Sequence, residues 1–217
     1  SLTAAGESFI AVVDPAELAA LVAERLAAGS LVGWVNGRME FGPRALGHRS
    51  ILADPRSSTV RRRLNDAVKE RESFRPFAPA VVAEAAPEWF GGGQLSPYMM
   101  FVAPVLDARL IEVAPEPLGL VERSDVVRST IPACTHVDGS ARVQIVERAT
   151  KPDFHRLLSA FGDLTGCPVL LNTSFNRSGE PIVATAEQAL ATARAGGLDL
   201  VVIEHLVIDL APKVAES

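Results

Sequence analysis

Short apolar runs alternate with segments of helical periodicity, and this pattern constrains the fold more than any other feature of the sequence. Residues 31–35 and 78–83 have the length and apolarity of buried strands. Residues 200–203 and 206–210 follow each other directly, which indicates paired strands, as in a hairpin. Strands that alternate with helices but also occur in pairs predict an α/β fold with a mixed sheet, rather than a strictly doubly wound parallel one.

The helices are predicted from their start and stop signals. Asp14, Pro15 and Glu17 form a strong helix start, because Asp caps the helix, Pro fits its first position and Glu its first turn. Gly29 ends that helix. Further helices are expected at 58–69, 152–164 and 185–195, and further strands at 9–13, 51–53, 98–105, 142–146 and 169–171.

The 217 residues are enough for one good core, so a single domain is the simplest organisation. We expect residues 1–8 to be a linker, which is compatible with a neighbouring domain upstream, residues 9–212 to form the domain, and 213–217 to be a tail. Residues 87–97 resemble a loop. Residues 107–135 have no clear period, so they are predicted to be mobile or ordered by substrate.

Composition limits the partners of the chain. The net charge of −5 argues against a general nucleic-acid binder, although it allows a local basic pocket. No apolar run reaches membrane-spanning length, so no membrane partner is expected. Cys134 and Cys167 lack the spacing of metal ligands and suit reduced thiols in a cytoplasmic protein.

The first segment with chemical potential runs from Arg38 to Ser50. It holds three arginines, Arg38, Arg44 and Arg49, with two glycines and a proline between them. Glycine lets the backbone approach an anion closely, and arginine binds phosphate in a bidentate fork. The same residues also fit a surface loop with solvated arginines, and the local sequence leaves both interpretations open.

A second segment, residues 69–79, passes from charged residues to a rigid Phe/Pro run. Lys69 and Arg75 could both reach a phosphate. The alternative is a helix C-terminus, where cations favour the negative end of the dipole. This alternative is the better interpretation of Arg71 and a fair one of Lys69.

In a third segment, His136 and Asp138 lie on an expected turn before a strand that carries Arg142. An arginine in this position can point into a cleft. His136 also fits a hydrogen-bonded turn residue, and His-x-Asp alone is a weak metal signal. We therefore predict no metal ligands in the chain.

The fourth segment begins where the expected strand 169–171 ends in small polar residues around one aromatic. Asn and Ser side chains can recognise an adenosine or a carbamoyl amide, or they can satisfy a local turn. Phe175 could stack on a base or pack in the core. The sequence has no phosphate-binding P-loop and no Gly-x-Ser-x-Gly elbow, which makes Ser174 a poor esterase nucleophile.

Together the four segments resemble the C-terminal region of the NodU/CmcH-type O-carbamoyltransferases. The resemblance covers roughly residues 33–205 in the family's order, and residues 39–47, 74–79, 135–139, 141–144 and 171–176 carry it. It implies a YrdC-like domain, a twisted mixed sheet flanked by helices. Such a domain binds ATP, carbamoyl phosphate and Mg²⁺ and makes carbamoyl-adenylate. A separate N-terminal transferase domain, with an iron site, passes the carbamoyl group to a hydroxyl acceptor.

The resemblance also assigns roles to residues. It implies that phosphate and carbamoyl groups are handled by four catalytic residues, Arg44, Lys69, Arg142 and Ser174. It also implies that Asn172, Thr173 and Asn176 line the same cleft and bind substrate or nucleotide. From the local segments, substrate or nucleotide binding is expected from Arg49, Arg75 and His136 as well. The region 107–135 would suit a lid that excludes water. The alternatives are a non-catalytic module that docks on a transferase domain and an RNA-binding module, which the negative charge disfavours.

Overall fold

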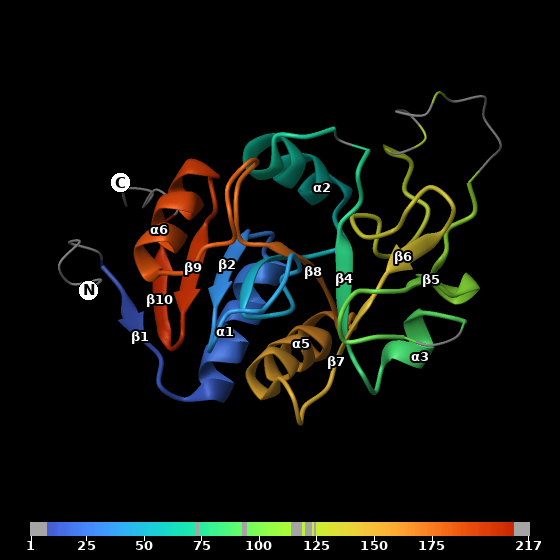
Figure 1. The fold of residues 1–217 in the computed structure, drawn as a ribbon. Helices are drawn as coiled ribbons and strands as arrows, with labels where there is room; N and C mark the ends of the chain where they lie inside the picture. The colour runs from blue at the N-terminus through green and yellow to red at the C-terminus, as the bar shows by residue number, and fades with distance from the viewer. Residues whose placement is uncertain are drawn as a thin grey trace, which may run out of the picture.

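The computed structural model describes residues 8–72, 74–92, 95–113, 119, 123 and 125–210. Within them, the strands of the main sheet are β1 (Ile10–Ala11), β2 (Val32–Val35), β3 (Arg49–Ala53), β4 (Ala78–Val82), β7 (Gln144–Val146), β8 (Val169–Ser174), β9 (Leu200–Ile203) and β10 (Leu206–Asp209). They lie in the order β1-β10-β9-β2-β3-β8-β4-β7 (Figure 1). A separate pair joins β5 (Val102–Pro104) to β6 (Ser140–Arg142).

The sheet is mixed, as its strand directions show. β2 runs parallel to β9 and β4 runs parallel to β7, whereas β8 is antiparallel to both of its neighbours, β3 and β4. β9 and β10 form the expected hairpin, with Leu206 opposite Ile203. The prediction of a single mixed α/β domain with a helix-flanked sheet is confirmed.

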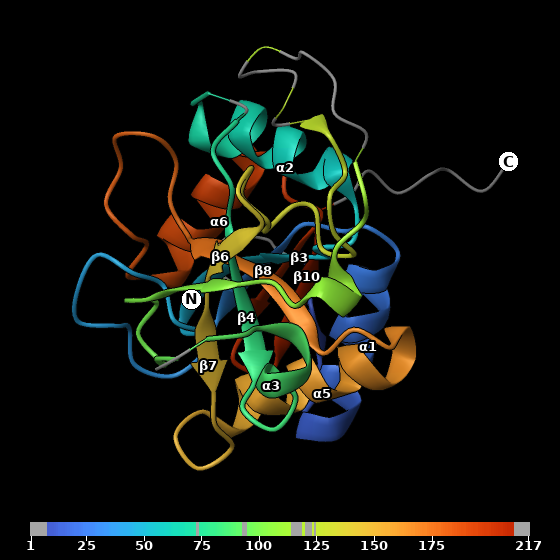
Figure 2. The same ribbon diagram turned by 90° about the vertical axis from the view of Figure 1, so that its right-hand side faces the viewer.

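Helices cover both faces of the sheet. α1 (Pro15–Ala27) and α5 (Pro152–Thr165) lie side by side on one face in both views (Figures 1 and 2), and α2 (Ser58–Leu64) and α6 (Ala186–Ala195) lie on the other. The alternation along β2 divides the core in the same way. Val32 and Trp34 pack with the α1 and α5 side, whereas Leu31 and Val35 pack with the α2 and α6 side.

The helix starts follow the capping signals of the sequence. The Asp14 carboxylate accepts hydrogen bonds from the backbone N–H groups of Ala16 at 2.6 Å and Glu17 at 3.2 Å. Thr185 and Gln188 form a capping box at the start of α6. Local chemistry therefore determines where these helices begin.

Several expected elements differ in the structure: the strand expected at 9–13 is only β1, the helix expected at 58–69 is an α-helix only to Leu64, and the strand expected at 169–171 extends to Ser174. The strand predicted at 142–146 is two short strands, because β6 pairs with β5 whereas β7 pairs with β4. The strand predicted at 98–105 is reduced to β5, and Met99 before it adopts a left-handed conformation with φ of 53°, which is not compatible with a strand. The loop predicted at 87–97 contains the end of a short helix, α3 (Ala86–Trp89).

The expectation for residues 107–135 is wrong at the C-terminal end of that region. Ile131, Ala133 and Cys134 are buried in the core, and Ser129 and Thr135 bind each other through their hydroxyls at 2.6 Å. This part is therefore packed structure and not a lid. Residues 114–118, 120–122 and 124 lie outside the described residues, as do residues 1–7 of the predicted linker and the whole predicted tail, 213–217. Among the helices described, none is long and apolar enough to cross a membrane.

Candidate functional site

A cleft of about 320 Å³ opens between the end of β8, the end of β6, the start of β4 and the neighbouring loops. The basic residues that line it are Arg44, Lys69, Arg71, Arg75, Arg142 and Arg177. No aspartate or glutamate is among the described residues that line it. A cleft whose charged lining residues are all cations, in a protein with a net charge of −5, is suited to an anion of high charge.

The first loop, residues 36–48, carries Arg44 on an anchored base. The carbonyl of Ala45 accepts a hydrogen bond from Asn172 Nδ2 at 3.3 Å, and the carbonyl of Leu46 accepts one from Gln144 Nε2 at 2.8 Å. Asn172 also donates to Gln144 Oε1 at 2.7 Å. Buried amides of β8 and β7 thus hold the backbone next to Arg44, whose own side chain is exposed at the cleft.

Lys69 reaches the cleft because α2 continues as a π-helical turn, η2 (Asn65–Lys69), which ends at Glu70 in a left-handed conformation with φ of 43°. Lys69 Nζ lies 2.7 Å from Ser174 O, 3.2 Å from Ser174 Oγ, and 2.8 Å from both Asn176 O and Asn176 Oδ1. Burial, reinforced by the charge of Arg71, lowers the pKa of Lys69 to about 7. The ammonium is thus held by neutral oxygens, without a carboxylate among these partners.

Arg71 lies in the cleft, contrary to its interpretation as a helix-terminal charge. Its guanidinium stacks over the Phe77 ring at 4.8 Å, and its Nε donates to Asn65 Oδ1 at 2.8 Å. Burial lowers the pKa of Arg71, and the charge of Arg75 lowers it further. The left-handed conformation of Glu70 places Lys69 and Arg71 beside one bend, and no sequence pattern indicated that bend.

Arg142 faces the cleft from the end of β6, as expected. Burial lowers the pKa of Arg142, with Arg44 contributing by repulsion. Arg142 in turn lowers the pKa of Arg71. Arg142 is therefore close enough to Arg44 and to Arg71 for repulsion with each, and a bound anion would offset that repulsion.

The polar end of β8 forms one wall of the cleft, through Asn172, Thr173 and Ser174, followed by Asn176. Ser174 Oγ donates to Asn176 Oδ1 at 2.6 Å, and Asn172 Oδ1 is buried without a hydrogen-bond partner among the described residues. Phe175 is 0% exposed and packs in the core, so it does not stack on a ligand.

Arg177 is a cleft residue that the sequence analysis missed. Its Nη2 donates to the Glu70 carboxylate, and its Nε is buried with no partner in the described part of the chain. Arg177 lies just after the polar residues that follow β8. It comes beside Glu70 only because the loop of residues 175–180 folds back in that direction. No local pattern indicated this contact.

A second cavity of about 360 Å³ adjoins the cleft and shares Pro76, Phe77 and Arg142 with it. His136 and Asp138 line this second cavity, with His136 Nδ1 3.1 Å from Asp138 Oδ1. The hydrogen bond from the Ser140 hydroxyl lowers the pKa of Asp138. The predicted residue His136 is thus near Arg142 but outside the cationic cleft itself.

Arg49 is the one predicted binding residue that the structure places away from both cavities. Its Nη1 donates to the backbone carbonyls of Gly37 and His48, each at 2.9 Å. It therefore fastens the base of the 36–48 loop. The expectation that Arg49 binds an anion rested on the composition of the segment. Composition does not show whether an arginine binds an anion or the backbone carbonyls of its own loop.

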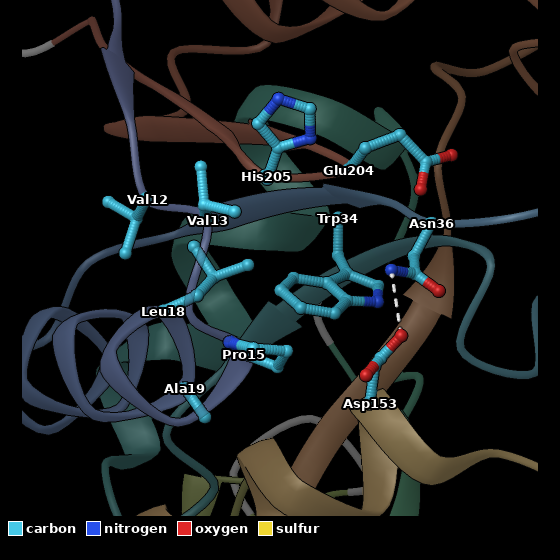
Figure 3. A pocket seen from close by; sticks show the side chains of 10 residues that line it. All are labelled: Val12, Val13, Pro15, Leu18, Ala19, Trp34, Asn36, Asp153, Glu204 and His205. Atoms are coloured by element: carbon cyan, nitrogen blue, oxygen red, sulfur yellow. Dashed lines mark hydrogen bonds between the residues drawn. The ribbon is translucent and has the colours of Figure 1, made fainter.

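A smaller cavity of about 140 Å³ lies elsewhere, between the start of α1, β2 and the start of α5. Figure 3 shows Asn36 pointing toward Asp153 beside the Trp34 ring, with Asn36 Nδ2 3.5 Å from Asp153 Oδ2. Its ionisable lining residues are Asp153, Glu204 and His205, so it is not suited to anions. No group of three or more His, Cys, Asp or Glu residues that could hold a metal ion occurs within the described ranges.

Comparison with known proteins shows the family of the chain. The sequence matches the family described as "Carbamoyltransferase C-terminus" over residues 23–209, which includes all the residues that line the cleft. The chain belongs to this family. It is 49% identical over 189 residues to the protein sll1178 of Synechocystis sp., covering 86% of the chain and 31% of that protein.

Two further relatives carry functional names. The chain is 43% identical to the nodulation protein NolNO of Sinorhizobium fredii, covering 88% of the chain and 26% of the relative. It is 38% identical to a 3'-hydroxymethylcephem-O-carbamoyltransferase of Amycolatopsis lactamdurans, covering 82% and 30%. The chain thus spans about a third or less of the length of each of these relatives.

A solved structure shares the fold. Full-length HypF, described in a phosphate- and nucleotide-bound form, superposes with a TM-score of 0.51 at 16% identity. The match covers 94% of the chain and 22% of HypF. At this identity the likeness concerns the fold of the carbamoyltransferase C-terminus domain alone.

Proposed function

We propose that this carbamoyltransferase C-terminus domain binds ATP and carbamoyl phosphate in the cationic cleft and forms carbamoyl-adenylate. The observation that carries the proposal is the set of six basic side chains with no carboxylate among the described residues that line the cleft. Three phosphates and a carbamoyl phosphate together present a high negative charge. Preorganised arginine and lysine side chains stabilise such charge as bonds to phosphorus form and break.

The reaction balances in two steps. Water first cleaves carbamoyl phosphate to carbamate and inorganic phosphate. A carbamate oxygen then attacks the α-phosphorus of ATP, a new P–O bond forms, and pyrophosphate leaves with the electrons of the broken P–O bond. Mg²⁺ accompanies ATP as part of the substrate.

The role proposed for each residue follows from its position in the cleft. Arg44, Arg71 and Arg142 converge on the cleft and would bind phosphoryl oxygens, with Lys69 beside Ser174 at its wall. Asn172 Oδ1 is a buried acceptor without a partner among the described residues, which suits a carbamoyl N–H. Ser174 holds Lys69 and Asn176 and is not proposed as a covalent nucleophile.

The final transfer belongs to another part of a longer protein. The curated relatives are several times longer than the matched region, and two of them are named for O-carbamoyl transfer to a hydroxymethyl cephem. We propose that a separate N-terminal transferase domain, which would hold any iron, passes the carbamoyl group to a hydroxyl acceptor. The buried free thiols of Cys134 and Cys167 suit a cytoplasmic location.

Pyrophosphate release from ATP and carbamoyl phosphate tests the proposal. We expect release to require both substrates and Arg142→Met to reduce its rate by about 10²–10³-fold, as for loss of one preorganised charge-stabilising donor. Arg25→Met is the matched control, since Arg25 pairs with Asp209 on the surface. A docking or RNA-binding module would release no pyrophosphate. Absence of both release and calorimetric binding of either substrate would exclude the proposed function.

A further inference from the structure

The carboxylate of Glu40 binds several backbone amides of the loop that carries Arg44. Glu40 Oε1 accepts hydrogen bonds from the N–H groups of Leu46 at 2.6 Å, His48 at 2.8 Å and Arg49 at 3.3 Å. Charge-assisted bonds of this kind are stronger than those between neutral groups. One oxygen thus fixes three of the four amides from residue 46 to residue 49.

Other side chains fix the carbonyls of the same stretch. Trp34 Nε1 donates to Gly47 O at 3.0 Å, and Arg49 Nη1 donates to His48 O at 2.9 Å. With the buried amides that bind Ala45 and Leu46, each backbone carbonyl from residue 45 to residue 48 accepts a side-chain hydrogen bond. The remaining amide, that of Gly47, donates to Ser50 Oγ at 3.1 Å.

Lys151 adds a charge at the base of the loop. Its Nζ lies 2.8 Å from His48 Nε2, while His48 Nδ1 lies 2.9 Å from Asn36 O. Burial lowers the pKa of Lys151, and the negative charge of Glu40 opposes that shift. Lys151 thus contributes a favourable charge near Glu40, whose second oxygen, Oε2, is buried without a hydrogen-bond partner among the described residues.

We propose that Glu40 is a positioning residue for Arg44. Arg44 lies between Glu40 and the first amide that Glu40 binds, so the bond to Leu46 N closes residues 40–46 into a ring with Arg44 on it. Gly42 takes a φ of 135° in this ring, a conformation that suits glycine. The inference rests on the proposed function only in that Arg44 binds an anion in the cleft.

The test is a double-mutant cycle read by the binding of pyrophosphate, measured by calorimetry. Glu40→Gln keeps the size of the side chain and one acceptor oxygen but removes the charge. We expect it to weaken pyrophosphate binding by about 10-fold, and to have little further effect in an Arg44→Ala background. Glu24→Gln, on the exposed face of α1, is the matched control and should change nothing.

The outcomes separate this inference from the proposed function. If the wild-type chain binds neither pyrophosphate nor either substrate, the proposed function fails, and with it the premise that Arg44 binds an anion. If the wild type binds it and Glu40→Gln weakens binding equally with and without Arg44, then Glu40 does not act through Arg44 and the inference is wrong. Unchanged binding in Glu40→Gln also overturns it. Glu40→Asp, which keeps the charge, should recover part of the affinity, and it replaces Glu40→Gln in the cycle if thermal melting shows that variant unfolded.

Discussion

At the scale of single residues, Lys69 differs from the arginines of the cleft because its charge is not permanent. Its partners are four oxygens of Ser174 and Asn176, which favour the ammonium form. Burial and the charge of Arg71 favour the neutral amine and bring the pKa of Lys69 to about 7. Both forms are therefore present near neutral pH, and an anion in the cleft would favour the charged one.

Anion binding should therefore be linked to proton uptake. At pH 8, above the pKa of Lys69 in the free protein, sulfate is expected to bind with uptake of a substantial fraction of one proton, because the bound dianion raises that pKa. At pH 6 the lysine is already charged, so uptake should fall toward zero. Calorimetry in two buffers of different ionisation enthalpy measures the uptake, and sulfate itself does not titrate in this range.

Two variants identify the titrating group. Lys69→Arg keeps a permanent charge, so it should bind sulfate without proton uptake. Lys69→Met should bind more weakly, also without uptake. Equal uptake by the wild type and Lys69→Arg at pH 8 would show that another group titrates.

At the scale of elements, the wall of the cleft depends on a contact between β2 and the end of β8. A Cβ atom at Gly33 would lie 2.5 Å from Cζ and 2.6 Å from Cε1 of Phe175. Phe175 stands between Ser174 and Asn176, the two residues that hold Lys69. Gly33 thus provides the space that sets the position of this wall.

Gly33→Ala should consequently destabilise the fold by about 1–3 kcal/mol, the usual cost of overpacking a core. Urea unfolding measures the change. The double variant Gly33→Ala with Phe175→Leu should be less destabilised than the sum of the two single changes, because the smaller side chain frees the space. Strict additivity of the two changes would mean that the aromatic ring is not what the new methyl group meets.

Elements with local signals were predicted well, whereas elements defined by their partners were not. Asp14 and Thr185 cap their helices through groups two or three residues away, so the sequence contains the whole interaction. The division of 142–146 into β6 and β7 has no such signal. The alternating pattern continues through Val143, and only the separate partners, β5 and β4, divide the strand.

The same distinction explains the candidate site. Arg44, Arg142 and the polar end of β8 follow from glycine-rich and strand-terminal patterns together with a family resemblance. Arg71 depends on the π-helical turn and the left-handed Glu70, which the helical pattern of 58–69 does not show. Arg49 resembles Arg44 in composition but binds carbonyls that only the folded loop brings near.

At the scale of the whole molecule, the cleft is positively charged whereas the chain as a whole carries a negative net charge. The chain has 21 basic and 26 acidic residues, yet six of the basic ones line the cleft, and no acidic residue is among its described lining. Their mutual repulsion destabilises the free fold, and the lowered pKa values of Arg71 and Arg142 reflect it in part. A ligand that offsets this repulsion should stabilise the whole domain.

Pyrophosphate should accordingly raise the melting temperature. At a concentration about 100-fold above its Kd, a ligand that binds only the folded state adds about 2.7 kcal/mol. For a domain of this size that corresponds to a shift of about 5–10 °C. Chloride at equal ionic strength should give a much smaller shift, because it lacks the charge and geometry for several arginines at once.

Two variants and an RNA ligand test whether this thermal shift arises from binding in the cleft. Arg71→Met should reduce the pyrophosphate shift, whereas Arg25→Met, which removes an exposed pair with Asp209, should preserve it. A single-stranded RNA oligonucleotide at 150 mM salt should give no shift, since the net charge of −5 disfavours binding of an extended polyanion outside the cleft. A shift with RNA that matched that of pyrophosphate would favour the RNA-binding alternative. An equal shift with chloride would mean that ionic strength alone stabilises the domain and that the cationic cleft does not act as a site.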